Sequence, residues 1–156
     1  MGVSVSALVV VPCGKRKIWD KSPTAGPTKA KDVYIGAPFK VNREYAEKYS
    51  NRWVILSAKY GLIDPSFVIS ENYDVTFKDA STNPISIREL KEQIKQKALD
   101  SFDAVVVLGG RDYADVVYDA FSDLDVKIKA PVAGLQLGYA MGAVRKAIDE
   151  GCPFDC

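Results

Sequence analysis

Three apolar runs in this sequence each end in a short segment whose side chains can bind anions or react. These segments are residues 12–17, 57–62 and 109–113, and they follow the apolar runs at residues 9–11, 53–56 and 105–108. In an open parallel α/β sheet, ligands bind in the crevice outside the carboxyl ends of the strands. If the three runs are parallel strands, the sequence predicts one shared pocket, in which glycines allow close approach and Lys or Arg side chains attract an anion.

The first segment places a cysteine and two lysines where the chain leaves its strand. Cys13 and Gly14 stand at that point, and Lys15 and Lys17 have side chains long enough to reach over a pocket. A lysine binds phosphate as a point charge, or acts as a nucleophile when it is desolvated. The structural alternative is that Cys13 is a small core residue and that the lysines belong to a solvated basic loop over residues 14–31.

The second segment combines a hydroxyl, a cation and an aromatic ring. Ser57 offers the hydroxyl, Lys59 the charge and Tyr60 a stacking face, while Gly61 permits a turn that a β-carbon would forbid. We therefore expect these four residues to bind substrate. The alternative is ordinary turn chemistry, because small and polar residues are favoured in turns whatever the function.

Histidine is absent from the sequence, so acid–base chemistry must come from other groups. Ser-His-Asp and Cys-His catalysis are excluded, as are sites that bind a metal through histidine. Asp74 and Glu71 are the best candidates for a general base, and Tyr73 lies between them in the chain. We expect Lys17, Asp74 and Cys13 to be the catalytic residues and Tyr73 to contact the substrate.

The third segment is typical of a phosphate site between a strand and a helix. Backbone N–H groups at Gly109 and Gly110 would face an anion, and Arg111 would add a bidentate contact. The glycine spacing is not that of a dinucleotide-binding fingerprint, and no Walker A lysine follows it. We expect no NAD, no ATP and no other cofactor.

Composition narrows the class of protein. The chain has 156 residues and a net charge of +1, so no general basic field indicates nucleic acid. Three cysteines do not make a disulfide framework, and the spacing from Cys152 to Cys156 is not a usual zinc spacing, so we expect no metal. No signal peptide and no apolar run long enough to span a membrane is present, which favours the cytoplasm. The oligomeric state cannot be read from the sequence.

The elements that must position these residues alternate between strand and helix. Strands are expected at residues 4–11, 53–56, 104–108 and 126–128, and helices begin at Pro38, Ser86, Arg111 and Leu137. Residues 18–37 are expected to be a long loop, a kind of segment that often serves as a functional lid. The pattern predicts a single α/β domain over residues 1–156, with three layers and a mainly parallel four-stranded sheet.

Several of these motifs resemble known families. Pro12-Cys13-Gly14-Lys15-Arg16-Lys17, Ser57-Ala58-Lys59-Tyr60-Gly61-Leu62 and the segment from Tyr73 to Thr76 resemble an uncharacterised family of prokaryotic and phage proteins. The second motif is similar to the YaaA-type peroxide-stress proteins. The spacing from Pro12-Cys13 to Lys17 resembles the signature of the archaeosine synthase catalytic domain, which modifies a deazaguanine base in tRNA, but Ile18-Trp19 stands where that signature has Pro-Tyr.

These resemblances imply a uracil-DNA glycosylase-like fold with its pocket at the strand ends. They also imply a domain that recognises a nucleobase or nucleotide, in nucleic acid or free, and that modifies or transfers a purine-like base. The alternative that the YaaA resemblance allows is a non-catalytic module that binds nucleic acid. Steep loss of affinity with salt would indicate a phosphate-dominated binder, whereas tight binding of a free nucleotide would not show such a slope.

Overall fold

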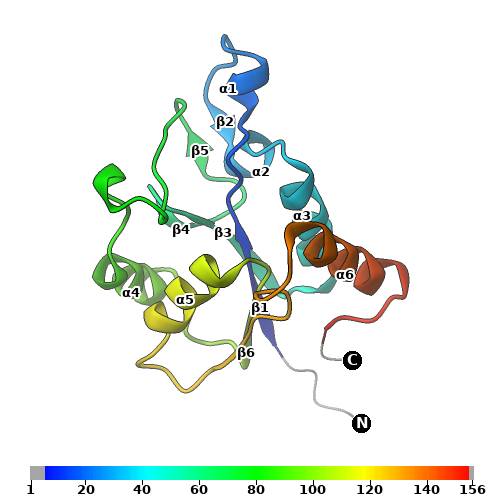
Figure 1. Cartoon of the computed structure of the whole chain (residues 1–156). Coiled ribbons are helices and arrows are strands. Elements are labelled where there is room, and N and C mark those ends of the chain that lie inside the picture. Colours follow the sequence, from blue (N-terminus) through cyan, green and yellow to red (C-terminus); the bar gives the residue numbers. More distant parts are fainter. Residues whose placement is uncertain (1–5, 155–156) are drawn as a thin grey trace.

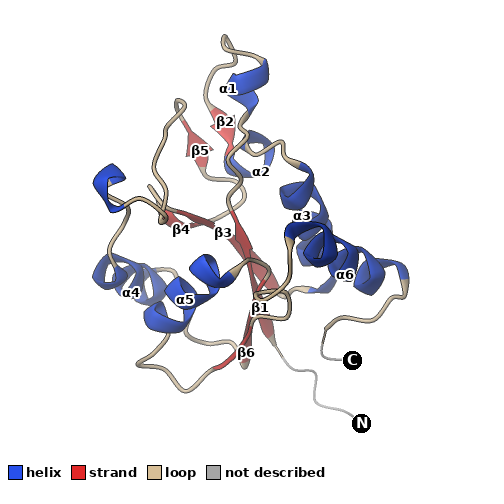
Figure 2. Cartoon of the chain, viewed as in Figure 1, coloured by secondary structure: helices blue, strands red, loops and turns tan. Residues whose placement is uncertain are grey.

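A central sheet of five strands organises the protein, which we describe from a computed structural model over residues 6–154. The strand order is β4-β3-β1-β6-β7, with bounds Gly61–Ile63, Arg52–Ser57, Ala7–Pro12, Ala104–Val107 and Lys127–Lys129. All neighbouring strands are parallel except β3 and β4. The predicted mainly parallel sheet is therefore confirmed, with one more strand than expected (Figures 1 and 2).

Helices cover both faces of the sheet, as the predicted three layers require. Helices α3 (Ala37–Tyr49) and α6 (Leu137–Asp149) lie together on one face, and α4 (Ile87–Gln96) and α5 (Arg111–Ala120) lie together on the other (Figure 2). The residues of β1 alternate between two separate cores: Val9 and Val11 pack toward α3 and α6, and Leu8 and Val10 toward α4 and α5. Because both faces of the strand are buried, its sequence is apolar throughout rather than alternating.

Strand β4 is the strand of the central sheet that the sequence analysis did not predict. It pairs antiparallel with β3, and Ser57 stands opposite Gly61 in that pairing. Gly61 has φ +80°, a conformation that glycine adopts without strain. The segment interpreted as a binding loop is thus largely a tight hairpin turn.

The expected long loop over residues 18–37 was also wrong in part. It contains two one-turn helices, α1 (Ile18–Lys21) and α2 (Ala30–Val33), and the short strand β2 (Thr28–Lys29). Strand β2 pairs antiparallel with β5 (Val68–Ile69), which follows β4 in the chain. In Figure 1 this small substructure projects beyond the carboxyl end of β1.

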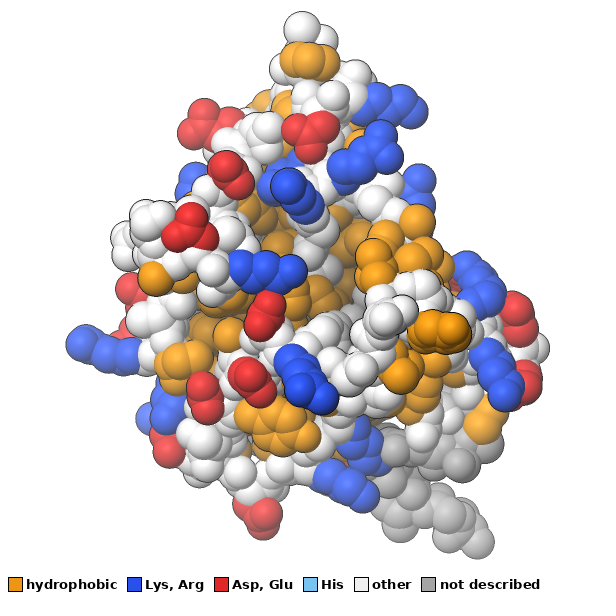
Figure 3. Space-filling view, in the orientation of Figure 1, with side chains coloured by type: hydrophobic (Ala, Val, Ile, Leu, Met, Phe, Trp, Pro, Cys, Tyr) orange, Lys and Arg blue, Asp and Glu red, His pale blue; other side chains and the backbone are white. Residues whose placement is uncertain are grey.

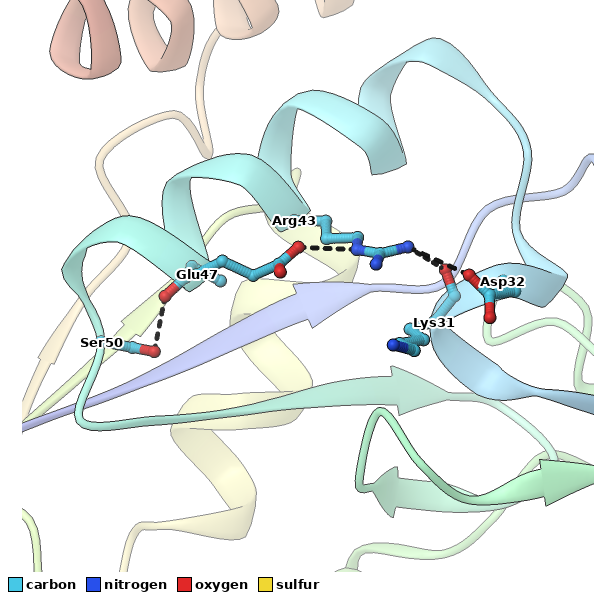
Figure 4. Close-up of polar contacts among 6 residues, drawn as sticks. Lys31, Asp32, Arg43, Glu47 and Ser50 are labelled. Atoms are coloured by element: carbon cyan, nitrogen blue, oxygen red, sulfur yellow. Dashed lines mark hydrogen bonds and ion pairs between the residues drawn. The ribbon is translucent and has the colours of Figure 1, made fainter.

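An arginine on α3 ties that small substructure to the main domain. Arg43 donates hydrogen bonds from its guanidinium to the carbonyl oxygen of Lys31 and to Asp32 on α2, and it pairs with Glu47 one turn along its own helix (Figure 4). At the end of the same helix, the hydroxyl of Ser50 donates to the carbonyl oxygen of Ala46. The segment after β1 is therefore fixed against the helix that follows it.

Helix α4 begins as the sequence predicted. The hydroxyl of Ser86 accepts a hydrogen bond from the backbone N–H of Glu89 at 3.1 Å. The short 3-10 helix η1 (Ala80–Thr82) precedes it. Across residues 6–154, no helix has the length and apolar character needed to cross a membrane.

Candidate functional site

A cleft of about 770 Å³ opens at the carboxyl ends of β1 and β6. The loop after β1 leads to α3 on one face of the sheet, and the loop after β6 leads to α5 on the opposite face. Such a divergence between neighbouring parallel strands is the topological switch point at which α/β proteins bind ligands. The predicted position of the pocket, at this edge of the sheet, is therefore matched by a cleft.

Eight of the expected site residues line the cleft. They are Cys13, Gly14, Lys15, Lys17, Tyr73, Asp74, Gly109 and Gly110. Figure 3 shows the corresponding face of the molecule, where hydrophobic side chains floor a central hollow and Lys and Arg side chains stand around it. The first and third segments thus meet in space, as their positions after neighbouring parallel strands predicted.

Three long helices begin at this cleft without a side-chain cap. Gly36, Gly110 and Gln136 occupy the N-cap positions of α3, α5 and α6, and none of their side chains caps the helix. Residues from the first turn or cap of each helix line the cleft: Pro38, Gly110 and Leu137. Helix α4, which contributes no residue to the cleft, is capped by Ser86. Uncapped first-turn N–H groups and the helix dipole together favour an anion.

Lys17 is a buried cation on the wall of this cleft. The residue is only 7% exposed, and within residues 6–154 its ammonium group forms no ion pair with a carboxylate. The carboxylate of Asp20 accepts a hydrogen bond from the backbone N–H of Lys17 and not from its ammonium group. Its Nζ lies 4.5 Å from the centroid of the Tyr73 ring and donates a hydrogen bond to the carbonyl oxygen of Lys15 at 3.4 Å. Burial of an ammonium group without a carboxylate is costly unless a ligand supplies the negative charge.

More positive charge stands at the mouth of the cleft. Lys15, Arg16 and Lys78 line it and are exposed, and none of them forms an ion pair within the described part of the chain. Asp74 is exposed on the same wall and is the one carboxylate among residues 6–154 that lines the cleft. It takes part in no hydrogen bond or ion pair among those residues. The sequence predicts Asp74 within reach of a cleft formed by residues 57–61, with its carboxylate near a lysine or a backbone N–H group. Asp74 instead lines the cleft beside residues 13–17, and within residues 6–154 its carboxylate has no such partner.

Ser57 does not face the cleft, contrary to expectation. Its side chain is fully buried (0% exposed), and its Oγ accepts hydrogen bonds from the N–H groups of Lys59 and Tyr60 at 3.2 and 3.1 Å. The same oxygen is 3.0 Å from the hydroxyl of Tyr73, which in turn is hydrogen-bonded to the hydroxyl of Tyr34. Ser57 therefore orders the turn after β3 and anchors Tyr73 behind the cleft wall.

Lys59, Tyr60 and Gly61 also lie outside the cleft lining. Tyr60 packs edge-on against Tyr73 with ring centroids 5.4 Å apart, and Lys59 lies 5.2 Å from the Tyr60 ring centroid. A β-carbon at Gly61 would come within 2.2 Å of the side-chain oxygen of Gln93. Gly61 is thus required by the hairpin and by Gln93, and the structural alternative describes it better than a role in binding.

Arg111 is the first residue of α5 but does not line the cleft. Its guanidinium lies beside Gly134, where an added β-carbon would be 3.6 Å from Nη2. Gly109 does line the cleft, but its lack of a side chain serves the protein itself. A β-carbon there would be 2.5 Å from Cγ of Pro12. The two neighbouring strand ends approach each other closely at this point.

Cys13 is a free, half-buried thiol beside Tyr113, a residue that was not among the expected site residues. Its Sγ is 3.5 Å from the hydroxyl of Tyr113, which lines the cleft. Burial is the largest cause that raises the pKa values of Tyr34, Tyr73 and Tyr113 well above the ordinary value, and the proximity of neighbouring titratable groups adds to it. These hydroxyls therefore stay protonated at neutral pH and act as hydrogen-bonding groups.

The sequence analysis also missed the contribution of α3. Phe39 and Asn42 line the cleft, and Asn42 donates a hydrogen bond to the carbonyl oxygen of Leu108 at the end of β6, at 3.0 Å. The signal was present, because Gly36 and Pro38 mark a helix start directly after the first basic segment. The sheet topology, which the sequence does not specify, brings that helix start close to residues 108–110.

No group of three or more potential metal-ligating residues occurs among residues 6–154. Cys152 is disulfide-bonded, which the sequence analysis did not predict, and Cys156 lies outside the described residues. The cleft instead offers a cationic wall, aromatic groups from Phe39, Tyr73 and Tyr113, and a free thiol. Such a set suits an anionic ligand that carries a ring.

Comparison with known proteins places the chain in a family. Residues 8–146 match the family described as "Family of unknown function (DUF6884)". The uncharacterised protein YfjM of Bacillus subtilis (strain 168) is 35% identical over 144 residues, which cover 92% of this chain and 95% of that protein. A crystal structure of AF0587, described as a protein of unknown function, has a TM-score of 0.44 and 13% identity over 92% of this chain. The match spans 44% of that longer protein.

Proposed function

Because the chain belongs to the family of unknown function DUF6884, we infer its function from its own cleft and propose that it is an enzyme-like domain that recognises a nucleobase or nucleotide. One observation carries this proposal. The cleft at the β1–β6 switch point combines three uncapped helix N-termini and four cations with the aromatic groups of Phe39, Tyr73 and Tyr113. The cations and helix termini favour a phosphate, and the aromatic walls favour a flat ring.

The proposed chemistry is modification or transfer at a purine-like base, in nucleic acid or as a nucleotide. Lys17 would be the nucleophile or the deepest phosphate ligand, and Lys15 would hold the phosphate at the mouth. Asp74 would act as the general base, since it is the carboxylate available on the wall. Cys13 would be a second nucleophilic group beside Tyr113. The resemblances to archaeosine synthase and to YaaA-type proteins support this assignment. We also propose, from the same resemblances, that the fold is uracil-DNA glycosylase-like.

The cleft residues indicate that a ring other than Tyr60, the expected stacking residue, contacts the base. Tyr60 lies outside the cleft, and the ring of Tyr73 already has Lys17 and Lys59 over it, at 4.5 and 5.6 Å. Tyr113 is therefore better placed than Tyr60 to contact a base, whereas Phe39 is only 2% exposed and contributes to the floor of the cleft. Tyr73 contributes a wall rather than a free stacking platform.

A thermal-shift screen tests the proposal, because a ligand that binds only the folded state raises its apparent stability. The screen compares nucleobases, nucleotides, short RNA and DNA, and inorganic phosphate alone. We expect at least one nucleotide or oligonucleotide to raise the melting temperature more than phosphate does. We also expect Lys15→Ala to remove that shift and Lys95→Ala, an exposed lysine on α4 away from the cleft, to keep it. A wild-type protein that responds to none of these compounds would contradict the proposal.

The alternative function is a non-catalytic module that binds nucleic acid through the same cations. The exposed residues Lys15, Arg16 and Lys78 at the mouth favour it, because they could contact a strand outside the cleft. Asp74→Asn separates the two functions. It should abolish turnover and preserve affinity in an enzyme, whereas a binding module has no turnover to lose, and its affinity falls steeply with rising salt.

A further inference from the structure

The contacts of Lys17 form a closed circuit with two tyrosines. The backbone of Lys17 pairs with that of Tyr34 in an antiparallel bridge, next to a hydrogen bond from the N–H of Ile35 to the carbonyl oxygen of Arg16. The hydroxyl of Tyr34 is hydrogen-bonded to that of Tyr73. The ammonium group of Lys17, in turn, lies 4.5 Å from the centroid of the Tyr73 ring. The position of each residue in this circuit depends on the other two.

Ser57 connects this circuit to the sheet and sets the direction of its hydrogen bonds. A serine oxygen has two acceptor sites, and the N–H groups of Lys59 and Tyr60 occupy both. The hydroxyl hydrogen of Ser57 must therefore be donated to the oxygen of Tyr73, 3.0 Å away. Because Ser57 is the last residue of β3, the ring of Tyr73 is held at a fixed height above the carboxyl edge of the sheet.

We propose that Tyr73 is a positioning residue that holds the ammonium group of Lys17 on the wall of the cleft, and that Ser57 and Tyr34 fix Tyr73 for this purpose. The attraction of a cation to an aromatic ring takes the place of the acidic partner that Lys17 lacks within residues 6–154. It holds the ammonium without neutralising it, so that its charge remains available to a ligand. This proposal rests on the proposed function only in taking Lys17 as a working group of the site.

The Ser57-Ala58-Lys59-Tyr60-Gly61 segment thus acts on the cleft indirectly, although none of its residues lines the cleft. Its serine orients the tyrosine, and its turn supplies the two N–H groups that orient the serine. A purely structural role for Tyr73 would require burial of the ring but would not require Lys17 to lie over it.

Amine labelling read by mass spectrometry tests this without a ligand. In the wild-type protein, Lys17 should label more slowly than the exposed Lys15 and Lys78, which serve as internal controls. Tyr73→Leu should raise the labelling rate of Lys17 by roughly three- to thirty-fold, the range that corresponds to typical cation–π strengths, and leave the two controls unchanged. Tyr73→Phe, which keeps the ring and loses the hydroxyl, should restore most of the protection. A folded Tyr73→Leu variant with unchanged labelling of Lys17 would overturn the proposal.

Proton NMR of the wild-type protein provides a test that does not depend on whether Tyr73→Leu folds. The ε-methylene protons of Lys17 should be shifted upfield of those of Lys15 by the ring current of Tyr73. Ordinary lysine shifts for Lys17 would overturn the proposal. Because neither measurement uses a nucleotide, a failed nucleotide screen would contradict the proposed function and leave this inference standing or falling on its own.

Discussion

Single residues decide whether each motif serves the cleft or the fold. Lys17, in the loop after β1, and Ser57, at the end of β3, are both buried, but Lys17 lines the cleft, whereas Ser57 is enclosed behind Tyr73. Residue type does not separate these cases, since both are polar and both follow an apolar run. The difference arises because a hairpin turns the chain away from the cleft after β3, whereas the loop after β1 lines the cleft.

Gly61 provides the sharpest prediction at the residue scale. Gly61→Ala should destabilise the protein, because a non-glycine residue held at φ +80° costs roughly 1–3 kcal/mol. The added β-carbon would also displace Gln93, whose side chain accepts from the N–H of Leu62 at 2.8 Å and donates to the carbonyl oxygen of Tyr60 at 2.9 Å. Each such hydrogen bond contributes about 0.5–1.5 kcal/mol. Urea unfolding measures the total.

The control for this prediction is Gly26→Ala. Gly26 is exposed and no atom lies within 4 Å of its added β-carbon, so the change should stay within about ±0.5 kcal/mol. Equal stability of the two variants would show that the hairpin tolerates a side chain at position 61, and that Gly61 has some other role.

At the scale of elements, the helices show which ends the protein stabilises by itself. Helix α4 has the cap that its Ser86-to-Glu89 spacing predicts, whereas α3, α5 and α6 begin with uncapped turns beside the cleft. Uncapped N–H groups reduce stability, and a side chain at the N-cap of a helix commonly contributes about 1 kcal/mol. The uncapped N–H groups of these three helices lie together at the cleft, as a binding site for anions requires.

This distribution predicts a trade between stability and binding at Gly110. Its backbone, with φ −70° and ψ −179°, is compatible with any N-cap residue. Gly110→Asp should raise the melting temperature, since aspartate caps a helix better than glycine by a few tenths of a kcal/mol and also interacts favourably with the dipole. The same carboxylate should abolish binding of phosphate-bearing ligands in the thermal-shift assay.

Gly110→Ser separates the effect of the negative charge from the effect of a capping side chain, because serine caps the helix without adding a charge. It should stabilise α5 as well and weaken binding much less than aspartate does. Equal binding by the two variants would mean that the ligand does not approach the start of α5.

The elements also show what the sequence could and could not predict. Buried parallel strands have continuous apolar sequences, and long helices have clear periodicity, so β1, β3, β6 and all four long helices were predicted close to their observed positions. Strand β4 has three residues and strands β2 and β5 have two each, too few to form a pattern. The site was predicted where loops follow neighbouring strands. The assignment of Ser57 and Gly61 to the site was wrong, because their roles depend on Tyr73 and Gln93, which are distant in sequence.

The buried tyrosines limit the stability of the whole molecule at alkaline pH. Burial raises the pKa of Tyr34, Tyr73 and Tyr113 in the folded state, so these groups stay protonated after the unfolded chain has lost its protons near pH 10. The unfolded state then binds fewer protons, and stability must fall as the pH rises above that value. Below pH 10 the contribution of these groups is constant.

Each of the three should lower the free energy of unfolding by about 1.4 kcal/mol per pH unit above pH 10. Melting temperatures measured from pH 8 to pH 11 should therefore be flat at first and then decline, and Tyr34→Phe should make the decline shallower. Tyr139→Phe is the matched control, because Tyr139 is 72% exposed and should not change the slope. A slope that is the same in the Tyr34→Phe variant would show that Tyr34 ionises freely in the folded protein.

The close approach of Gly109 to Pro12 has a consequence for how this family can vary. A β-carbon at position 109 would lie 2.5 Å from Cγ of Pro12, and 3.1 Å from Cβ of Tyr113. The space between the two strand ends is therefore fixed, and a larger side chain at position 109 requires a smaller one at position 12. Among relatives that keep this fold, a side chain at the position of Gly109 should appear only together with a residue smaller than proline at the position of Pro12. An aligned set of relatives in which the two positions vary independently would show that the strand ends can move apart.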